Sequence, residues 1–276
     1  MLKTRVITAV VLLAVLLPIL YFNNFTAFAL VAIAFFGAAV WECFRLFNPK
    51  SAKAPIVAVF WTAAFAWAFF GPSQPNPVFW YAISLLLWAL RFAPSLKVGL
   101  PPLDSTANTL LSVVYAVSLV GCFAAIVALF AYSPLYLLSV MAIVWAADIF
   151  AYFSGKAFGK RKLAPSISPG KSWEGAIGGG IAVLVIATLV IVLAGDSLAN
   201  TFPVRVQASL GWTATYAILV LIVAASIVGD LFESQLKRRA GMKDSSNLLP
   251  GHGGVLDRID ALVPVLPLAA LIGTWL

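Results

Sequence analysis

The chain has 276 residues, of which 62% are hydrophobic and only 10% are charged. A soluble domain usually carries about 25% charged residues, so this composition excludes an ordinary soluble protein and predicts a surface that faces lipid. The net charge of +8 would suggest nucleic acid as a partner of a soluble protein. Basic residues beside apolar segments instead set orientation in a membrane, and we expect no nucleic-acid partner.

The apolar segments predict an all-α, polytopic integral membrane protein with about nine transmembrane helices. A spanning helix needs about 20 mostly apolar residues. The first apolar run follows Lys3 and Arg5 and resembles a signal peptide, but no small-residue cleavage site follows it, so we expect it to be retained. In chain order the segments are 6–22, 26–44, 55–70, 77–90, 108–131, 134–154, 176–194, 212–236 and 260–276.

The distribution of basic residues orients these nine segments. If the N-terminus is cytoplasmic, 17 of the 18 Lys and Arg residues fall in stretches on the cytoplasmic side, and only Arg205 falls outside. These five basic stretches are 1–5, 45–54, 91–107, 155–175 and 237–259. The positive-inside rule therefore predicts a cytoplasmic N-terminus.

The acidic residues divide the chain into two predicted regions. Seven of the ten acids lie in the windows 146–175 and 229–260, which also hold ten basic residues and the only histidine, His252. We therefore expect N-terminal scaffold helices over 1–131 and a catalytic transmembrane region over 132–276, with cytoplasmic loops 155–175 and 237–259. Cys43 and Cys122 lie in apolar runs and are expected to be buried thiols.

Two acids lie where apolar segments end on the predicted cytoplasmic side. Asp148 is near the end of one segment and Asp230 is near the end of another. A carboxylate at this position costs a few kcal/mol unless it is paired, hydrated or bound to a cation. The two acids are therefore candidate ion ligands, and pairing with a nearby Lys or Arg is the alternative.

The loop 155–175 is basic and rich in glycine. Gly170-Lys171-Ser172 resembles the end of a phosphate-binding P-loop, but Pro165 stands where that motif needs glycine, so the P-loop interpretation fails. A basic loop that enters a helix can still bind phosphates through Lys side chains and backbone N–H groups. For residues 160–162, attraction to anionic lipid heads is the alternative. Gly175 and Gly179 have the spacing of closely packed helices.

The stretch 234–260 carries the most information about chemistry. Asp257 and Asp260 are three residues apart at the start of the last apolar segment, so both can face one side of a helix. A few carboxylates, completed by substrate phosphates and water, are the usual ligands of magnesium. His252 suits a structural role or a phosphate contact as well as it suits a metal.

The same stretch resembles the phosphatidate cytidylyltransferases, also called CDP-diacylglycerol synthases. Their hallmark is Ser-x-x-Lys-Arg, four residues, Lys-Asp, and then His-Gly-Gly-x-x-Asp-Arg-x-Asp. It is complete here as Ser234, Lys237, Arg238, Lys243, Asp244, His252, Gly253, Gly254, Asp257, Arg258 and Asp260. The resemblance extends upstream to the Asp148 region and the loop 168–175, whereas the first 130 residues resemble the family only in hydrophobicity.

The resemblance implies a reaction in which a phosphate oxygen of phosphatidic acid attacks the α-phosphorus of CTP. The products are CDP-diacylglycerol and pyrophosphate, and the location is a bacterial-type inner membrane with the site on the cytoplasmic side. The implied catalytic residues are Asp257, Asp260, Arg258, Lys237, Lys243, Asp244 and His252. The implied substrate-binding residues are Lys171, Ser172, Glu174, Ser234, Arg238, Gly253 and Gly254. The expected metal ligands are Asp230, Asp257 and Asp148.

The implied cofactor is Mg²⁺, as one or two ions, and a monovalent ion such as K⁺ is left open. The expected partners are CTP, phosphatidic acid and the lipid bilayer, with a homodimer left open. A CTP-dependent polyprenol or phytol kinase is the related alternative, and it would release CDP rather than pyrophosphate. A membrane transporter is the alternative from another class, but the charges gather at one face and no internal repeat is visible.

Overall fold

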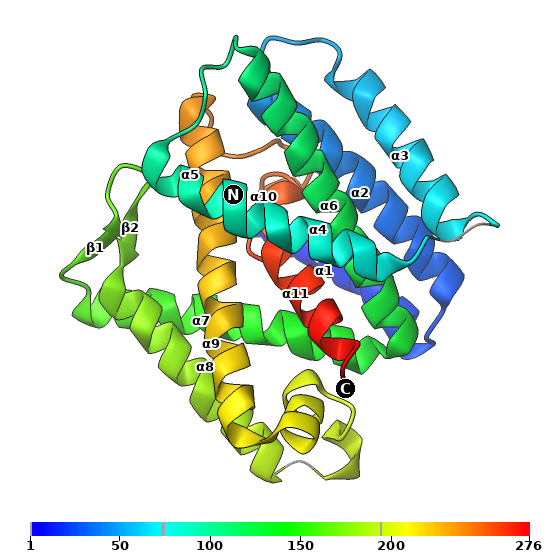
Figure 1. Cartoon of the computed structure of the whole chain (residues 1–276), viewed down its shortest axis with the longest axis vertical. Coiled ribbons are helices and arrows are strands. Elements are labelled where there is room, and N and C mark those ends of the chain that lie inside the picture. The colour runs from blue at the N-terminus through cyan, green and yellow to red at the C-terminus, as the bar shows by residue number, and fades with distance from the viewer. Residues whose placement is uncertain (1, 73–74, 194) are drawn as a thin grey trace.

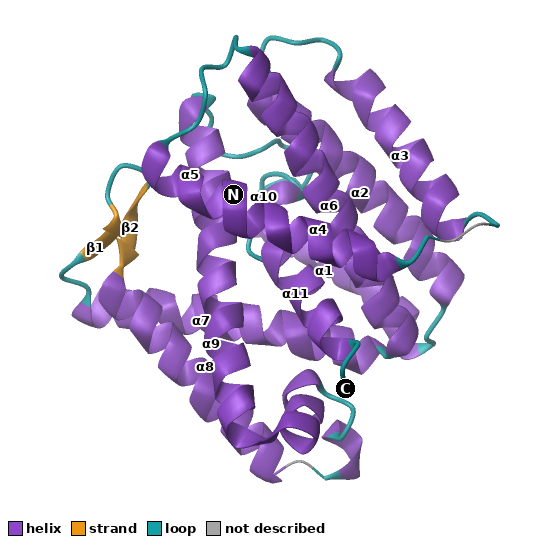
Figure 2. Cartoon of the chain, in the orientation of Figure 1, coloured by secondary structure: helices purple, strands orange, loops and turns teal. Residues whose placement is uncertain are grey.

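Helices dominate the computed structural model, which describes residues 2–72, 75–193 and 195–276 (Figures 1 and 2). The first half contains α1 (Leu2–Tyr21), α2 (Phe25–Phe47), α3 (Ala54–Phe70), α4 (Pro77–Leu87), α5 (Ala93–Val98) and α6 (Thr106–Tyr132). The second half contains α7 (Pro134–Phe158), α8 (Trp173–Leu193), α9 (Phe202–Arg239), α10 (Leu256–Ile259) and α11 (Leu262–Gly273). The predicted helical membrane fold is confirmed.

Each of the nine predicted segments coincides with a helix. Within the described residues, seven helices are long and apolar enough to cross a membrane, with α4 and α5 counted as one helix. The apolar helices α3 and α11 are shorter, with 17 and 12 residues. Large apolar side chains are exposed along α1 and α8, which suits contact with lipid. The count of nine spans and the cytoplasmic N-terminus stay predictions.

The fourth segment continues further than its sequence indicated. A π-helical turn at Trp88–Phe92 joins α4 to α5, so the helix runs on to Val98. Pro94, which has no N–H to donate, directly follows the π-helical turn, where the regular i to i−4 hydrogen-bond pattern is already interrupted. Arg91 and Lys97 therefore lie on a helix rather than in a loop.

Two further differences concern the second half. The loop 155–175 contains an antiparallel hairpin of β1 (Lys162–Ala164) and β2 (Ser168–Ser172), which the sequence analysis did not predict. Helix α9 begins ten residues before the predicted segment 212–236, at Phe202. Gly211 interrupts α9 with φ 76° and ψ 175°, a conformation that glycine adopts readily.

Two sets of contacts position the helices that carry the candidate site. The rings of Phe92, Tyr115 and Phe232 pack together with centroids 4.8 to 5.4 Å apart and anchor the second part of α9. A Cβ atom on Gly175 would lie 2.8 Å from the Ala151 carbonyl oxygen, and one on Gly179 would lie 2.5 Å from that of Ala147. The predicted close packing at these two glycines is confirmed as the contact of α8 with α7.

Candidate active site

The five basic stretches meet at one end of the molecule. Each of the first four is joined to the stretch 237–259 by a hydrogen bond from an arginine side chain to a backbone carbonyl. The pairs are Arg5 with Gly251 (3.0 Å), Arg45 with Ser245 (2.7 Å), Arg239 with Pro101 (2.8 Å) and Arg238 with Ile167 (3.5 Å). The five basic stretches therefore lie at a common face of the molecule, as the positive-inside rule requires.

A pocket of about 520 Å³ lies at this end, between α7, the hairpin, α8 and α9. Its lining includes four predicted site residues: Asp148, Lys171, Ser172 and Asp230. The Lys171 Nζ lies 2.5 Å from Asp230 Oδ2, and both side chains are partly exposed. The volume falls in the range of about 300–1,000 Å³ that small-molecule sites occupy. Hairpin and helix residues predicted separately thus share one concave site.

Glu174 and Ser172 have local partners that shape this pocket. The Glu174 carboxylate accepts hydrogen bonds from the backbone N–H groups of Lys160 and Arg161 and from the Arg161 Nε. The Ser172 hydroxyl accepts a hydrogen bond of 3.1 Å from the Gly175 N–H at the start of α8. Both side chains therefore stabilise the junction of the hairpin with α8, and their substrate contacts stay predictions.

One face of α9 connects the pocket with the loop that follows the helix. Asp230, Ser234 and Lys237 are spaced by four and three residues, so they lie along one side of the helix. The Ser234 hydroxyl donates to Asp230 Oδ1 over 3.3 Å. Lys237 forms ion pairs with Glu233 on the same helix and with Asp257, where the Nζ to Oδ1 distance is 2.6 Å.

The Asp257 carboxylate is held by several donors besides Lys237. Its Oδ2 accepts hydrogen bonds from the Ser245 N–H (2.8 Å), the Ser245 hydroxyl (2.8 Å) and the Gly254 N–H (2.7 Å). Burial alone would raise the pKa of Asp257, but the Lys237 ammonium and these hydrogen bonds lower it below its usual value. Asp257 is therefore an anion whose orientation is set by the loop.

The glycines of this loop approach carboxylates of the chain itself. Gly253 has φ 85°, and a Cβ there would lie 2.7 Å from Asp257 Oδ2. A Cβ on Gly254 would lie 2.4 Å from Glu42 Oε1. Gly253 and Gly254 were predicted to bind substrate, and in the structure their backbone closely approaches two acidic side chains. Direct binding of substrate by Gly253 and Gly254 stays a prediction.

The other predicted catalytic residues surround this loop. Asp260 lies against α9, because a Cβ on Gly229, next to Asp230, would come within 2.4 Å of the Asp260 carbonyl oxygen. Lys243, Asp244 and Arg258 are exposed, and Arg258 forms no ion pair with Asp260 among the side chains that the structure describes. His252 is half-buried, with a Nδ1 atom that has no hydrogen-bond partner in the described chain.

The predicted metal ligands divide between the two parts of the site. Asp148 and Asp230 line the pocket, whereas Asp257 belongs to the loop. Over residues 2–72, 75–193 and 195–276, no three His, Cys, Asp or Glu side chains form a group that could hold a metal ion. Within the described residues, one or two carboxylates at a time could therefore contact an ion. The assignment of Asp148, Asp230 and Asp257 as metal ligands stays a prediction.

Glu42, which was not among the predicted site residues, is fully buried in α2 and hydrogen bonded to the loop 245–256. The signal was available, because an acid within the apolar segment 26–44 is by default a sign of a functional site. Glu42 lies outside the two acid-rich windows 146–175 and 229–260, so it was assigned to the scaffold region. Ser245 was also missed, because a serine between Asp244 and Ser246 carries no pattern of its own.

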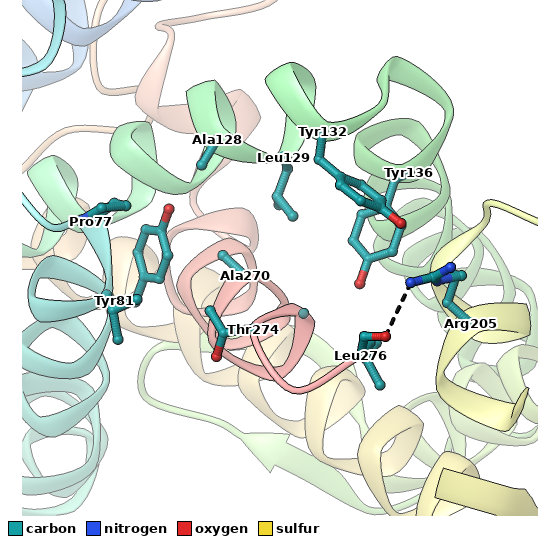
Figure 3. Close-up of a pocket in the computed structure, with 12 residues that line it drawn as sticks. Pro77, Tyr81, Ala128, Leu129, Tyr132, Tyr136, Arg205, Ala270, Thr274 and Leu276 are labelled. Atoms are coloured by element: carbon teal, nitrogen blue, oxygen red, sulfur yellow. Dashed lines mark hydrogen bonds between the residues drawn. The ribbon is translucent and has the colours of Figure 1, made fainter. Parts of the chain in front are cut away.

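A second pocket, of about 270 Å³, lies where α4, α7 and α9 begin and where α6 and α11 end (Figure 3). Its polar groups include Tyr81, Tyr136 and Arg205, whose Nη2 donates to the Leu276 carbonyl oxygen over 3.1 Å. None of the predicted site residues is among the described residues that line it. Arg205 lies near the start of α9, whereas the basic stretch 237–259 begins at the end of that helix. Its position on the outer side of a membrane stays a prediction.

Comparison with known proteins agrees with the resemblance seen in the sequence. The model of the Cytidylyltransferase family matches residues 3–276. A phosphatidate cytidylyltransferase of Haemophilus influenzae is 38% identical over 298 residues, which cover 97% of this chain and 96% of the relative. The enzymes of that name from Pseudomonas aeruginosa and Thermotoga maritima are 52% and 43% identical over 134 and 135 residues, about half of each chain. This chain belongs to the cytidylyltransferase family.

Proposed function

We propose that this chain transfers a cytidylyl group from CTP to phosphatidic acid and so produces CDP-diacylglycerol and pyrophosphate. The observation that carries the proposal is the pocket in which Lys171 and Asp230 face one another at the end where the basic stretches gather. The similarity to phosphatidate cytidylyltransferases over almost the whole chain supports the same reaction.

The pocket suits a substrate pair of which one is soluble and the other is held in the bilayer. Lys156 and Lys171 offer positive charge to phosphates, and Tyr152 and Ile227 give the same pocket an apolar side on α7 and α9. Charge for a triphosphate and apolar surface for acyl chains therefore meet in one cavity. Such a cavity lies at a membrane surface, and we place it on the cytoplasmic face of a bacterial inner membrane.

The proposed reaction asks the protein mainly to align its substrates. The attacking phosphate oxygen is already an anion, so no general base is needed. Lys171 and Lys237 reduce the repulsion between the two anionic substrates, and the hairpin and α9 hold them in line for displacement of pyrophosphate. Arg258 is exposed beside Asp257 and can neutralise charge that develops on the leaving group.

Magnesium is part of the proposal, with Asp148, Asp230 and Asp257 as ligands. The donor set fits, because Mg²⁺ is usually bound through one or two carboxylates together with substrate phosphates rather than in a cage made only of protein atoms. An ion held by Asp148 and Asp230, or one held by Asp257, would neutralise phosphate charge. Within the described residues, two of the proposed ligands, Asp148 and Asp230, line the pocket, and the third, Asp257, lies in the loop 237–259.

The test is to incubate the purified full chain in detergent micelles with phosphatidic acid, Mg²⁺ and CTP labelled in either the α- or the γ-phosphate. We expect the α-label in the lipid and the γ-label in pyrophosphate. Transfer of the γ-label to a lipid with release of CDP would replace the proposal with a kinase, and absence of both products would remove it. The variant Arg205→Gln is the matched control, because it alters a basic residue away from the site and should retain activity.

A further inference from the structure

A carboxylate on α2 organises the loop that carries Asp257. Glu42 is fully buried, although α2 is an apolar helix. Its two oxygens accept four hydrogen bonds, all from the segment 245–256. The donors are the Ser246 hydroxyl (2.5 Å), the Val255 N–H (3.0 Å), the Leu256 N–H (2.6 Å) and the Ser245 hydroxyl (3.0 Å), whose single proton is shared with Asp257.

Glu42 is not half of a structural ion pair. No Lys or Arg in the described residues lies within salt-bridge distance of it. Arg45 is one turn further along α2, but its Nη1 donates to the Ser245 carbonyl oxygen over 2.7 Å. Both charged residues of α2 are thus directed to the same loop. An ionised side chain buried in this way is expensive unless it is fully hydrogen bonded, and here the loop supplies the donors.

Two routes connect Glu42 with Asp257. Ser245 places its hydroxyl 3.0 Å from Glu42 Oε2 and 2.8 Å from Asp257 Oδ2, and its N–H also donates to Asp257. On the second route, Glu42 binds the N–H of Leu256, the residue directly before Asp257. A change at Glu42 therefore reaches Asp257 through a side chain and through the backbone.

We propose that Glu42 is a positioning residue that fixes the segment 245–257 against α2 and thereby holds Asp257 in its working orientation. The importance of Asp257 for turnover rests on the proposed function, whereas the anchoring of the segment does not. The N-terminal helices are thus part of the active site and more than a scaffold.

The test uses the full chain with Glu42→Gln, which keeps the size of the side chain but points an NH₂ group at N–H and O–H donors. Hydrogen exchange of peptides within 244–257 should accelerate at least about tenfold, because the variant weakens several hydrogen bonds that hold this segment closed. Peptides from α6 and α8 should keep their exchange rates. Cys43→Ser is the matched control on α2, because Cys43 faces the Ser112 carbonyl oxygen and not the loop.

The kinetic measurement separates positioning from general stability. In Glu42→Gln, kcat should fall at least about tenfold while KM for CTP stays within about threefold, since the pocket around Lys171 is unchanged. Cys43→Ser should keep kcat within about twofold of the unmodified chain. Faster exchange with an unchanged kcat would overturn the positioning role, and so would faster exchange throughout the chain.

If Glu42→Gln does not fold, Ser246→Ala removes one of the four donors and keeps the acid. Exchange of 244–257 should then accelerate by about threefold to tenfold, and an unchanged rate would overturn the proposed anchor. Failure of the unmodified chain to produce CDP-diacylglycerol would remove the proposed function, but the exchange measurement would still test whether Glu42 holds the loop.

Discussion

Replacing Lys237 by Met should destabilise the protein strongly, because one ammonium group serves two buried carboxylates. Lys237 pairs with Glu233, whose side chain is 0% exposed, and with Asp257, whose side chain is 4% exposed. Met has a similar shape and restores the packing of the aliphatic stem, so the variant isolates the loss of the charge. Both carboxylates then remain in a buried position without their cation.

The magnitude follows from the burial of the partners. Breaking a buried ion pair by removing one member costs about 3–5 kcal/mol, and we expect the unfolding free energy of Lys237→Met to fall by this amount. Asp257 keeps its donors from Ser245 and Gly254, whereas Glu233 loses its ion partner, so most of the loss should come from Glu233. The double variant Lys237→Met with Glu233→Leu should therefore regain more than half of the lost stability.

The assay is reversible unfolding in mixed detergent micelles with increasing SDS, followed by tryptophan fluorescence. Lys53→Met is the control, because Lys53 is exposed and forms no ion pair in the described chain, and its effect should stay within about 0.5 kcal/mol. A Lys237→Met variant within 1 kcal/mol of the unmodified chain would refute the reasoning. A double variant that is less stable than Lys237→Met would show that Glu233 is not the residue left unpaired.

Three other variants test the close contacts and the loop. Gly254→Ala places a Cβ 2.0 Å from the Ser245 hydroxyl oxygen and should lower the unfolding free energy by about 1–3 kcal/mol, whereas Gly195→Ala, with no atom within 4 Å, should change little. Gly179→Ala should cost a similar 1–3 kcal/mol, visible as a lower thermal midpoint, because it forces α8 away from α7. Asp257→Asn should leave the chain folded, with a lower thermal midpoint because the ion pair with Lys237 is lost, and should lower turnover of CTP by about 100-fold or more; largely intact activity would contradict the proposed role of Asp257.

The arrangement of the helices was predictable because membrane sequences separate charge from apolar surface. The count of basic residues placed five stretches on one face, and arginine hydrogen bonds join four of them to the fifth. The helix ends were less predictable. The pattern of apolar residues does not predict the π-helical turn at Trp88 or the interruption of α9 at Gly211, because neither feature changes the hydropathy of the chain.

The candidate site was predictable where residue type and spacing carry chemistry, and not where the partner is distant in the chain. Asp148, Lys171 and Asp230 were each selected from their position, and the structure places them around one pocket. The hairpin was missed because its short strands contain Pro169 and Gly170 and lack an alternating pattern. Glu42 was overlooked although it is an acid within an apolar segment. Its donors lie more than 200 residues away and could not be inferred from its neighbours.

The contacts of Glu42 also set an order of events during synthesis. Val255 and Leu256 leave the ribosome 213 and 214 residues after Glu42, which takes about 10–40 s at roughly 5–20 residues per second. For that interval the second helix carries an acid whose final donors do not yet exist, so water, a lipid head or an insertion factor has to accommodate it. The segment 245–257 can therefore take its final position on α2 only after Leu256 has been made, long after the second helix itself.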